Sequence, residues 1–139
     1  MVSLSLAAAA LLLIRTWTAN PPPADWVPVS DQAAAAIRSC PGPLYNHYND
    51  GGYLIWFTPE QKVFLDSRQD PYPLDLTQAQ QRAERSGSYQ ALLDRYSVRC
   101  AVLRPDSNAL SALERLGWRE DFRDQRWVVV ELPQSVPPR

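Results

Sequence analysis

The sequence is poor in the residues that most often carry catalysis or bind metals. Its 139 residues include one histidine, one methionine and two cysteines, which excludes a four-cysteine zinc site and a disulfide-framework miniprotein. Lysine is limited to Lys62 and the net charge is −1, so no basic field exists to hold nucleic acid. The chain also lacks a Gly-x-Ser-x-Gly nucleophile motif and a phosphate-binding loop. These absences predict no metal, no cofactor and no nucleic-acid partner.

Proline, in contrast, is abundant, and its distribution predicts the domain boundaries. The chain has 13 prolines, with Pro21–Pro23 and Pro28 near the start and three more in the last seven residues. Consecutive prolines favour an extended segment because their φ is fixed and they lack a backbone donor. We therefore expect a proline-rich linker over 16–29, one soluble domain over 30–132 and a disordered tail over 133–139.

The segment ahead of the linker is apolar from Val2 to Ile14. Thirteen residues are too few to span a bilayer, which needs roughly 20. A signal peptide should begin with positive charge, whereas the only nearby cation, Arg15, follows the run. The pattern favours residues 1–15 as the end of a transmembrane helix whose first half lies upstream; a degenerate signal or membrane anchor and a soluble helix are the alternatives. In the first two cases, the membrane is a partner.

The remaining pattern alternates between short apolar runs and amphipathic segments. Ser30 or Asp31 can cap a first helix, and Ser107 or Asp106 a later one. The segment 53–57 is ambiguous between strand and helix, and we favour the helix. Expected helices are 32–38, 53–57, 77–96 (interrupted near 86–88) and 109–116, and expected strands are 44–48, 62–66, 99–103, 118–122 and 126–132.

This order of elements predicts an α/β domain with three layers. We expect a mostly parallel sheet of about five strands with an antiparallel hairpin at its C-terminal end. Right-handed crossovers suggest that the strands lie side by side in the order 62–66, 44–48, 99–103, 126–132, 118–122.

Ligands of open α/β sheets usually bind beyond the carboxyl ends of the strands. Polar side chains follow the first two expected strands, and their carboxylates and imidazole could perform acid–base chemistry. A purely structural interpretation also fits, with Asp50 capping a helix and Asp66 paired with Arg68 or a backbone amide. The candidate binding residues at this edge are His47, Asp50, Asp66, Arg68, Asp70 and Tyr72.

The two cysteines precede or begin neighbouring parallel strands in this topology. Cys40 and Cys100 would both lie at the amino edge of the sheet, so a disulfide is geometrically allowed if their Cα atoms lie within about 7 Å. Two unrelated buried thiols are the alternative. A disulfide would indicate an oxidising compartment.

Three segments carry a resemblance to a known family: Leu44–Trp56 (LYNHYNDGGYLIW), Lys62–Arg68 (KVFLDSR) and Asp70–Pro73 (DPYP). Residues 40–132 resemble the soluble C-terminal domain of multi-spanning bacterial membrane proteins related to C-type, oligosaccharyltransferase-like glycosyltransferases. Asn49–Tyr53 is placed like the segment of oligosaccharyltransferases that contacts the acceptor peptide, which adds Tyr53 to the candidate binding residues, although the tryptophan pair of that segment is missing here.

The resemblance implies an accessory domain rather than a self-sufficient enzyme, because the catalytic acid of the superfamily lies in a loop between membrane helices. It also implies a periplasmic location. Our first hypothesis is a non-catalytic module that contacts a lipid-linked sugar, a peptide acceptor or a partner protein. The alternatives are a small secreted or anchored enzyme that uses His47 with Asp50 or Asp66, and a structural interaction domain without a ligand.

Overall fold

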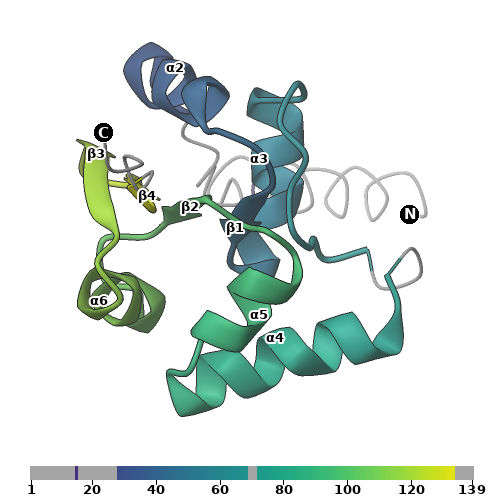
Figure 1. The fold of residues 1–139 in the computed structure, drawn as a ribbon. Helices are drawn as coiled ribbons and strands as arrows, with labels where there is room; N and C mark the ends of the chain where they lie inside the picture. The colour runs from purple at the N-terminus through teal and green to yellow at the C-terminus, as the bar shows by residue number, and fades with distance from the viewer. Residues whose placement is uncertain (1–14, 16–27, 69–71, 134–139) are drawn as a thin grey trace, which may run out of the picture.

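The structure, a computed structural model, describes Arg15 and residues 28–68 and 72–133 (Figure 1). The apolar stretch before Arg15, most of the expected linker, Asp70 and the tail beyond residue 133 lie outside the described residues. The helices are α2 (Asp31–Ser39), the 3-10 helix η1 (Tyr48–Asp50), α3 (Gly51–Phe57), α4 (Leu74–Ser86), α5 (Gln90–Arg95) and α6 (Asn108–Arg115). The strands are β1 (Leu44–Asn46), β2 (Cys100–Leu103), β3 (Arg119–Arg123) and β4 (Val128–Glu131).

The expectation of a mostly parallel five-stranded sheet is wrong. The described strands form one mixed four-stranded sheet in the order β1-β2-β4-β3. Only β1 and β2 pair in parallel, with Leu44 opposite Cys100, whereas β4 is antiparallel to both β2 and β3. β4 lies beside β2 and β3 forms the edge, as expected, but the antiparallel pairs dominate because the segment 62–66 forms no strand, which leaves a single parallel pair.

The fifth expected strand, 62–66, does not form. This segment is nevertheless fixed beside β1 by one side chain, that of Asn46. The Asn46 amide accepts a hydrogen bond from the Phe64 N–H (2.7 Å) and donates one to the Leu65 carbonyl (2.8 Å). A side-chain amide thus replaces the backbone ladder of a strand pair, which satisfies buried polar groups without a strand.

The sheet lies between two helical layers, which Figure 1 shows as α2 and α3 on one side and α4, α5 and α6 on the other. Alternate residues of the central strands face opposite layers, as the period of a strand requires. On one face, Ala101, Leu103, Val128 and Val130 pack with side chains of α4–α6, such as Leu93 and Leu113. On the other face, Leu44, Val102 and Val129 pack with Ile37 of α2 and Leu54 of α3.

Several predicted helix boundaries are confirmed. Ser30 caps α2 by accepting a hydrogen bond from the Ala33 amide, and Ser107 caps α6 through the Ala109 amide. The segment 53–57 is helical, as favoured, and the long helix is interrupted at Gly87, which takes a left-handed φ of 69°. Such a φ is accessible to glycine at little cost, so the break between α4 and α5 follows from the residue type.

Cys40 and Cys100 form a disulfide, with their Cα atoms 5.5 Å apart. The bond joins the C-terminal end of α2 to the first residue of β2, so it connects one helical layer to the centre of the sheet. A disulfide indicates an oxidising compartment. Among the described residues, no helix has the length and apolar character needed to cross a membrane.

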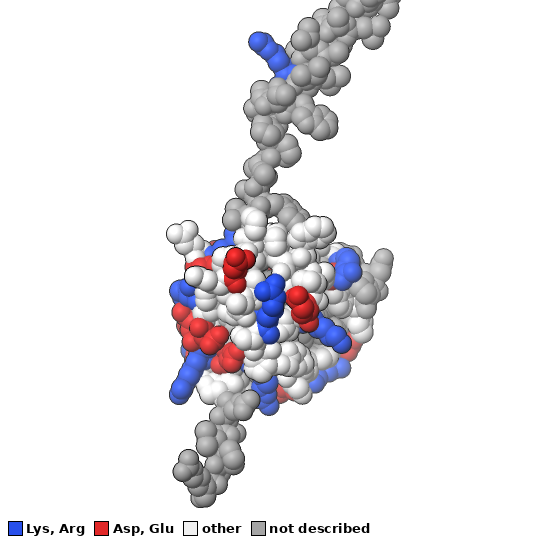
Figure 2. Space-filling view, turned by 90° about the horizontal axis from the view of Figure 1, so that it is seen from above, with Lys and Arg blue, Asp and Glu red and all other residues white. Residues whose placement is uncertain are grey.

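Charged side chains of both signs are interspersed over the face that Figure 2 shows. Over the described surface as a whole, exposed charged side chains form ion pairs, such as Arg38 with Glu60 and Arg95 with Asp75. Exposed pairs of this kind contribute little to stability. This face therefore offers no continuous patch of one sign to attract a highly charged partner.

Candidate functional site

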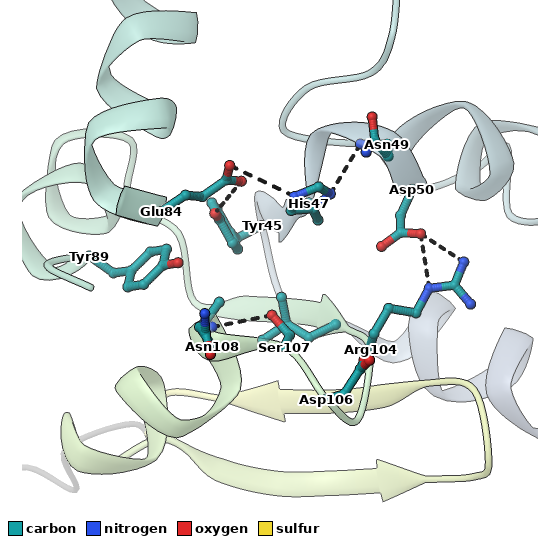
Figure 3. Close-up of a pocket in the computed structure, with 12 residues that line it drawn as sticks. Tyr45, His47, Asn49, Asp50, Glu84, Tyr89, Arg104, Asp106, Ser107 and Asn108 are labelled. Atoms are coloured by element: carbon teal, nitrogen blue, oxygen red, sulfur yellow. Dashed lines mark hydrogen bonds and ion pairs between the residues drawn. The ribbon is translucent and has the colours of Figure 1, made fainter. Parts of the chain in front are cut away.

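A cleft of about 380 Å³ opens at the carboxyl ends of the two parallel strands, β1 and β2. This position is where ligands bind in open α/β sheets, and the volume lies in the range of about 300–1,000 Å³ that small-molecule sites occupy. Figure 3 shows that the lining side chains come from the segment of β1 and η1, from α4 and Tyr89 just before α5, and from the loop that connects β2 to the start of α6. They are Tyr45, His47, Asn49, Asp50, Glu84, Tyr89, Leu103, Arg104, Asp106, Ser107, Asn108 and Ala109.

Glu84 of α4 occupies one wall, with its carboxylate directed toward β1 (Figure 3). It accepts a hydrogen bond from the Tyr45 hydroxyl at 3.4 Å and lies 3.8 Å from His47 Nε2. Burial raises the pKa of the Tyr45 and Tyr89 hydroxyls, and the Glu84 charge raises both further. The two tyrosines therefore stay protonated, and the single hydroxyl proton of Tyr45 is donated to Glu84.

His47 is positioned by the backbone rather than by a catalytic partner. Its Nδ1 accepts a hydrogen bond from the Asn49 amide at 3.3 Å, which makes His47 the N-cap of η1. The lone pair of Nδ1 is thereby occupied, and in the neutral ring the proton lies on Nε2, on the side of Glu84. This arrangement suits a ring that donates a hydrogen bond, whereas a general base needs an available lone pair.

The opposite wall is built around Arg104, which follows β2. Its guanidinium donates two hydrogen bonds to Asp50 Oδ1, at 2.9 and 2.7 Å, and lies over the Trp127 ring, 4.0 Å from the ring centroid. A planar guanidinium combines such hydrogen bonds with stacking on an aromatic ring. Asp50 is buried and makes no capping hydrogen bond to α3, so its expected role as a helix cap is not what the structure shows.

The charge balance of the cleft is negative. Three lining carboxylates, Asp50, Glu84 and Asp106, oppose the single guanidinium of Arg104, which is already paired with Asp50. The floor at the start of α6 adds the Ser107 hydroxyl, which caps the helix, and the Asn108 side chain. A polyanionic ligand would meet repulsion here, whereas amides, hydroxyls and carboxylates suit a neutral polyhydroxylated molecule.

A second cavity, of about 520 Å³, lies on the other side of His47 and Glu84. His47, Asn49 and Glu84 line both cavities and so form their common wall. The other described residues that line it include neither arginine nor lysine, and they combine aromatic, amide, hydroxyl and aliphatic side chains: Tyr48, Leu65, Tyr72, Leu74, Thr77, Gln80 and Gln81.

Asp66 is completely buried and fully engaged within its own segment. Its carboxylate receives the Arg68 guanidinium (2.6 Å to Nη2), the Arg68 backbone amide and the Tyr72 hydroxyl (2.7 Å). The hydrogen bonds from Arg68 lower the pKa of Asp66 to about 2, against the opposing effect of burial. Asp66 therefore has a structural role in holding Arg68 and Tyr72, as the structural alternative proposed.

The sequence-based candidates therefore divide into several groups. His47 and Asp50 line the first cleft, and Tyr72 lines the second cavity. Asp66 and Arg68 pair with each other. Asp70 lies outside the described residues, so the structure says nothing about its role.

Tyr53 lies on the other side of the sheet from the cleft. It packs against Phe57 and Trp127 there, and its hydroxyl accepts a hydrogen bond from Arg126. Among the described residues, no side-chain contact joins His47 to Asp50 or to Asp66, so an acid–base pair built on the His47 ring and either carboxylate is not assembled.

Sequence reasoning missed Tyr45, Glu84, Tyr89, Arg104 and Asn108. Arg104 could have been found, because it follows the second parallel strand directly and the carboxyl ends of such strands share one edge. Glu84 could not, because it lies within a helix whose exposed face carries many other charged residues.

Comparison of the chain with protein-family models, with curated proteins and with solved structures finds no match.

Proposed function

We propose that this chain is a non-catalytic binding module located outside the cytoplasm, and that its cleft binds the sugar part of a ligand handled by a glycosyltransferase-like membrane protein. The observation that carries the proposal is the cleft at the ends of β1 and β2. It is lined by carboxylates, side-chain amides, the Ser107 hydroxyl and the buried tyrosines Tyr45 and Tyr89, without surplus positive charge. These groups match the hydroxyls and apolar faces of a sugar.

The location rests on the disulfide, because such bonds persist in oxidising compartments. The absence of catalysis rests on how the candidate groups are used. Asp50 and Asp66 are each neutralised by an arginine, and His47 accepts a backbone hydrogen bond. The association with a membrane protein follows from the sequence resemblance described above.

The test is calorimetric titration of the full chain with glucose, galactose, mannose and N-acetylglucosamine. We expect saturable binding of at least one sugar and weaker binding of glucose 6-phosphate than of glucose, because the lining is acidic. Glu84→Gln should weaken binding about tenfold, the effect of losing one hydrogen bond to a charged group.

Glu60→Gln is the matched control, since it makes the same chemical change at an exposed residue that pairs with Arg38 on α2. Its affinity should equal that of the unmodified chain. Failure of every sugar to bind, or equal effects of Glu84→Gln and Glu60→Gln, would refute the proposal.

A further inference from the structure

The two cavities lie next to each other and have related chemistry. His47, Asn49 and Glu84 form the wall between them. The wall is partly accessible, because the side chains of His47 and Glu84 keep 43% and 25% of their surface exposed. A ligand that fills the first cleft can therefore continue across these side chains into the second cavity without a change in the backbone.

The second cavity repeats the features that suit the first cleft to a sugar. Tyr48 and Tyr72 provide aromatic surface, whereas Thr77 and Gln81 provide a hydroxyl and an amide. Leu65 lies buried at the cavity and Leu74 is strongly exposed beside it. Such a mixture of apolar surface and a few polar groups is typical of ligand sites.

The described lining of both cavities lacks surplus positive charge. Among the described residues, the second cavity adds no carboxylate, arginine or lysine to Glu84, which it shares with the first cleft. A phosphate or a uronic acid would meet none of the described guanidinium or ammonium groups in its lining, since Arg104 lies in the first cleft and is held by Asp50. The described lining therefore favours a ligand that is uncharged along its length.

We infer that the two cavities are adjoining subsites for a neutral glycan of at least two sugar units, with the linkage between the units lying over His47 and Glu84. This inference rests on the proposed function, because it assumes that the first cleft binds a sugar. It extends that function by specifying the ligand as an oligosaccharide rather than a single sugar.

The test compares a monosaccharide with its disaccharides on the full chain: glucose with maltose and cellobiose, and N-acetylglucosamine with its β-1,4-linked dimer. At least one disaccharide should bind about tenfold more tightly than its monosaccharide, as one or two added hydrogen bonds would produce. Gln81→Ala should remove this gain and leave the monosaccharide affinity unchanged, because Gln81 lines only the second cavity.

Gln78→Ala is the matched control, since Gln78 is also exposed on α4 but lines neither cavity. It should keep both affinities. Monosaccharide binding without a disaccharide gain, or a gain that survives Gln81→Ala, overturns the inference and leaves the proposed function intact. Absence of binding by every sugar overturns both.

Discussion

The adjacent glycines at the start of α3 offer a sharp test of how the site is built. Gly51 and Gly52 are both helical, but their surroundings differ. A Cβ atom added at Gly51 would overlap the Leu65 carbonyl oxygen and lie 2.7 Å from Asp66 Cβ and 2.8 Å from Asp66 Cα. A Cβ atom at Gly52 would meet only the Ser67 hydroxyl, at 3.9 Å. Alanine should therefore have opposite effects at the two positions.

The magnitude follows from two opposing contributions. Replacing a helical glycine with alanine stabilises a helix by about 0.5–1 kcal/mol, and at Gly52 nothing opposes this gain. At Gly51 the backbone of residues 65–66 must move away, and overpacking of this kind costs about 1–3 kcal/mol. We expect Gly52→Ala to raise the free energy of unfolding by up to about 1 kcal/mol and Gly51→Ala to lower it by about 1–2 kcal/mol.

The assay is thermal unfolding followed by circular dichroism. In a domain of this size, 1 kcal/mol corresponds to roughly 4–8 °C in Tm. Gly51→Ala should therefore unfold about 4–16 °C below the unmodified chain, and Gly52→Ala a few degrees above it. Equal Tm values for the two variants would show that α3 does not pack against residues 65–66 as closely as described, and the reasoning would fail.

Three further predictions concern the charged and covalent contacts. The pKa of Asp66 is lowered to about 2, so the stability that this carboxylate contributes is present above about pH 4, the pKa of an aspartate in the unfolded chain, and is lost as the pH falls toward 2. Urea unfolding between pH 5 and 2 should show a falling free energy of unfolding in the unmodified chain and a smaller fall in Asp66→Asn. Replacing both Cys40 and Cys100 with alanine opens a loop with a sequence separation of 60 and should lower the free energy of unfolding by about 4 kcal/mol, as measured by guanidinium titration. Reduction of the unmodified chain is the reference, and an unchanged free energy of unfolding after reduction would count against the disulfide. Arg104→Lys loses the two hydrogen bonds to Asp50 and the stacking on Trp127, so it should lower the free energy of unfolding by about 1–2 kcal/mol. A double-mutant cycle with Asp50→Asn should give a clear coupling energy, and strictly additive effects would contradict the pairing.

Local signals in the sequence predicted the helices well, because the residues that end them act over a few positions. Ser30 and Ser107 cap their helices through the next few amides, and Gly87 breaks a helix through its own backbone conformation. The error at 62–66 has a different origin. A short apolar run is typical of a buried strand, but the hydrogen-bonding partner of this segment is the side chain of Asn46. The periodicity of apolar residues in the sequence gives no sign of such a contact.

The candidate site shows the same division between local and long-range information. The edge of the sheet was predictable, because it follows from the order of elements and the rule for parallel strands. The partners of its charged residues were not, since Asp50 pairs with Arg104 across 54 positions and Tyr45 meets Glu84 across 39. Asp66 and Arg68 are only two residues apart, and their pairing, like the Ser107 cap of α6, is a local contact that the sequence pattern suggested.

The packing at Gly51 and the second cavity depend on the same segment. Gly51 lets α3 approach residues 65–66, and Asn46 holds Phe64 and Leu65 beside β1. Leu65 lines the second cavity but not the first cleft. If Gly51→Ala displaces this segment, the disaccharide gain should fall while monosaccharide affinity in the first cleft is kept. Loss of both affinities in a folded variant would instead mean that the two subsites are structurally coupled, so that a displacement of Leu65 also displaces the wall formed by His47 and Glu84.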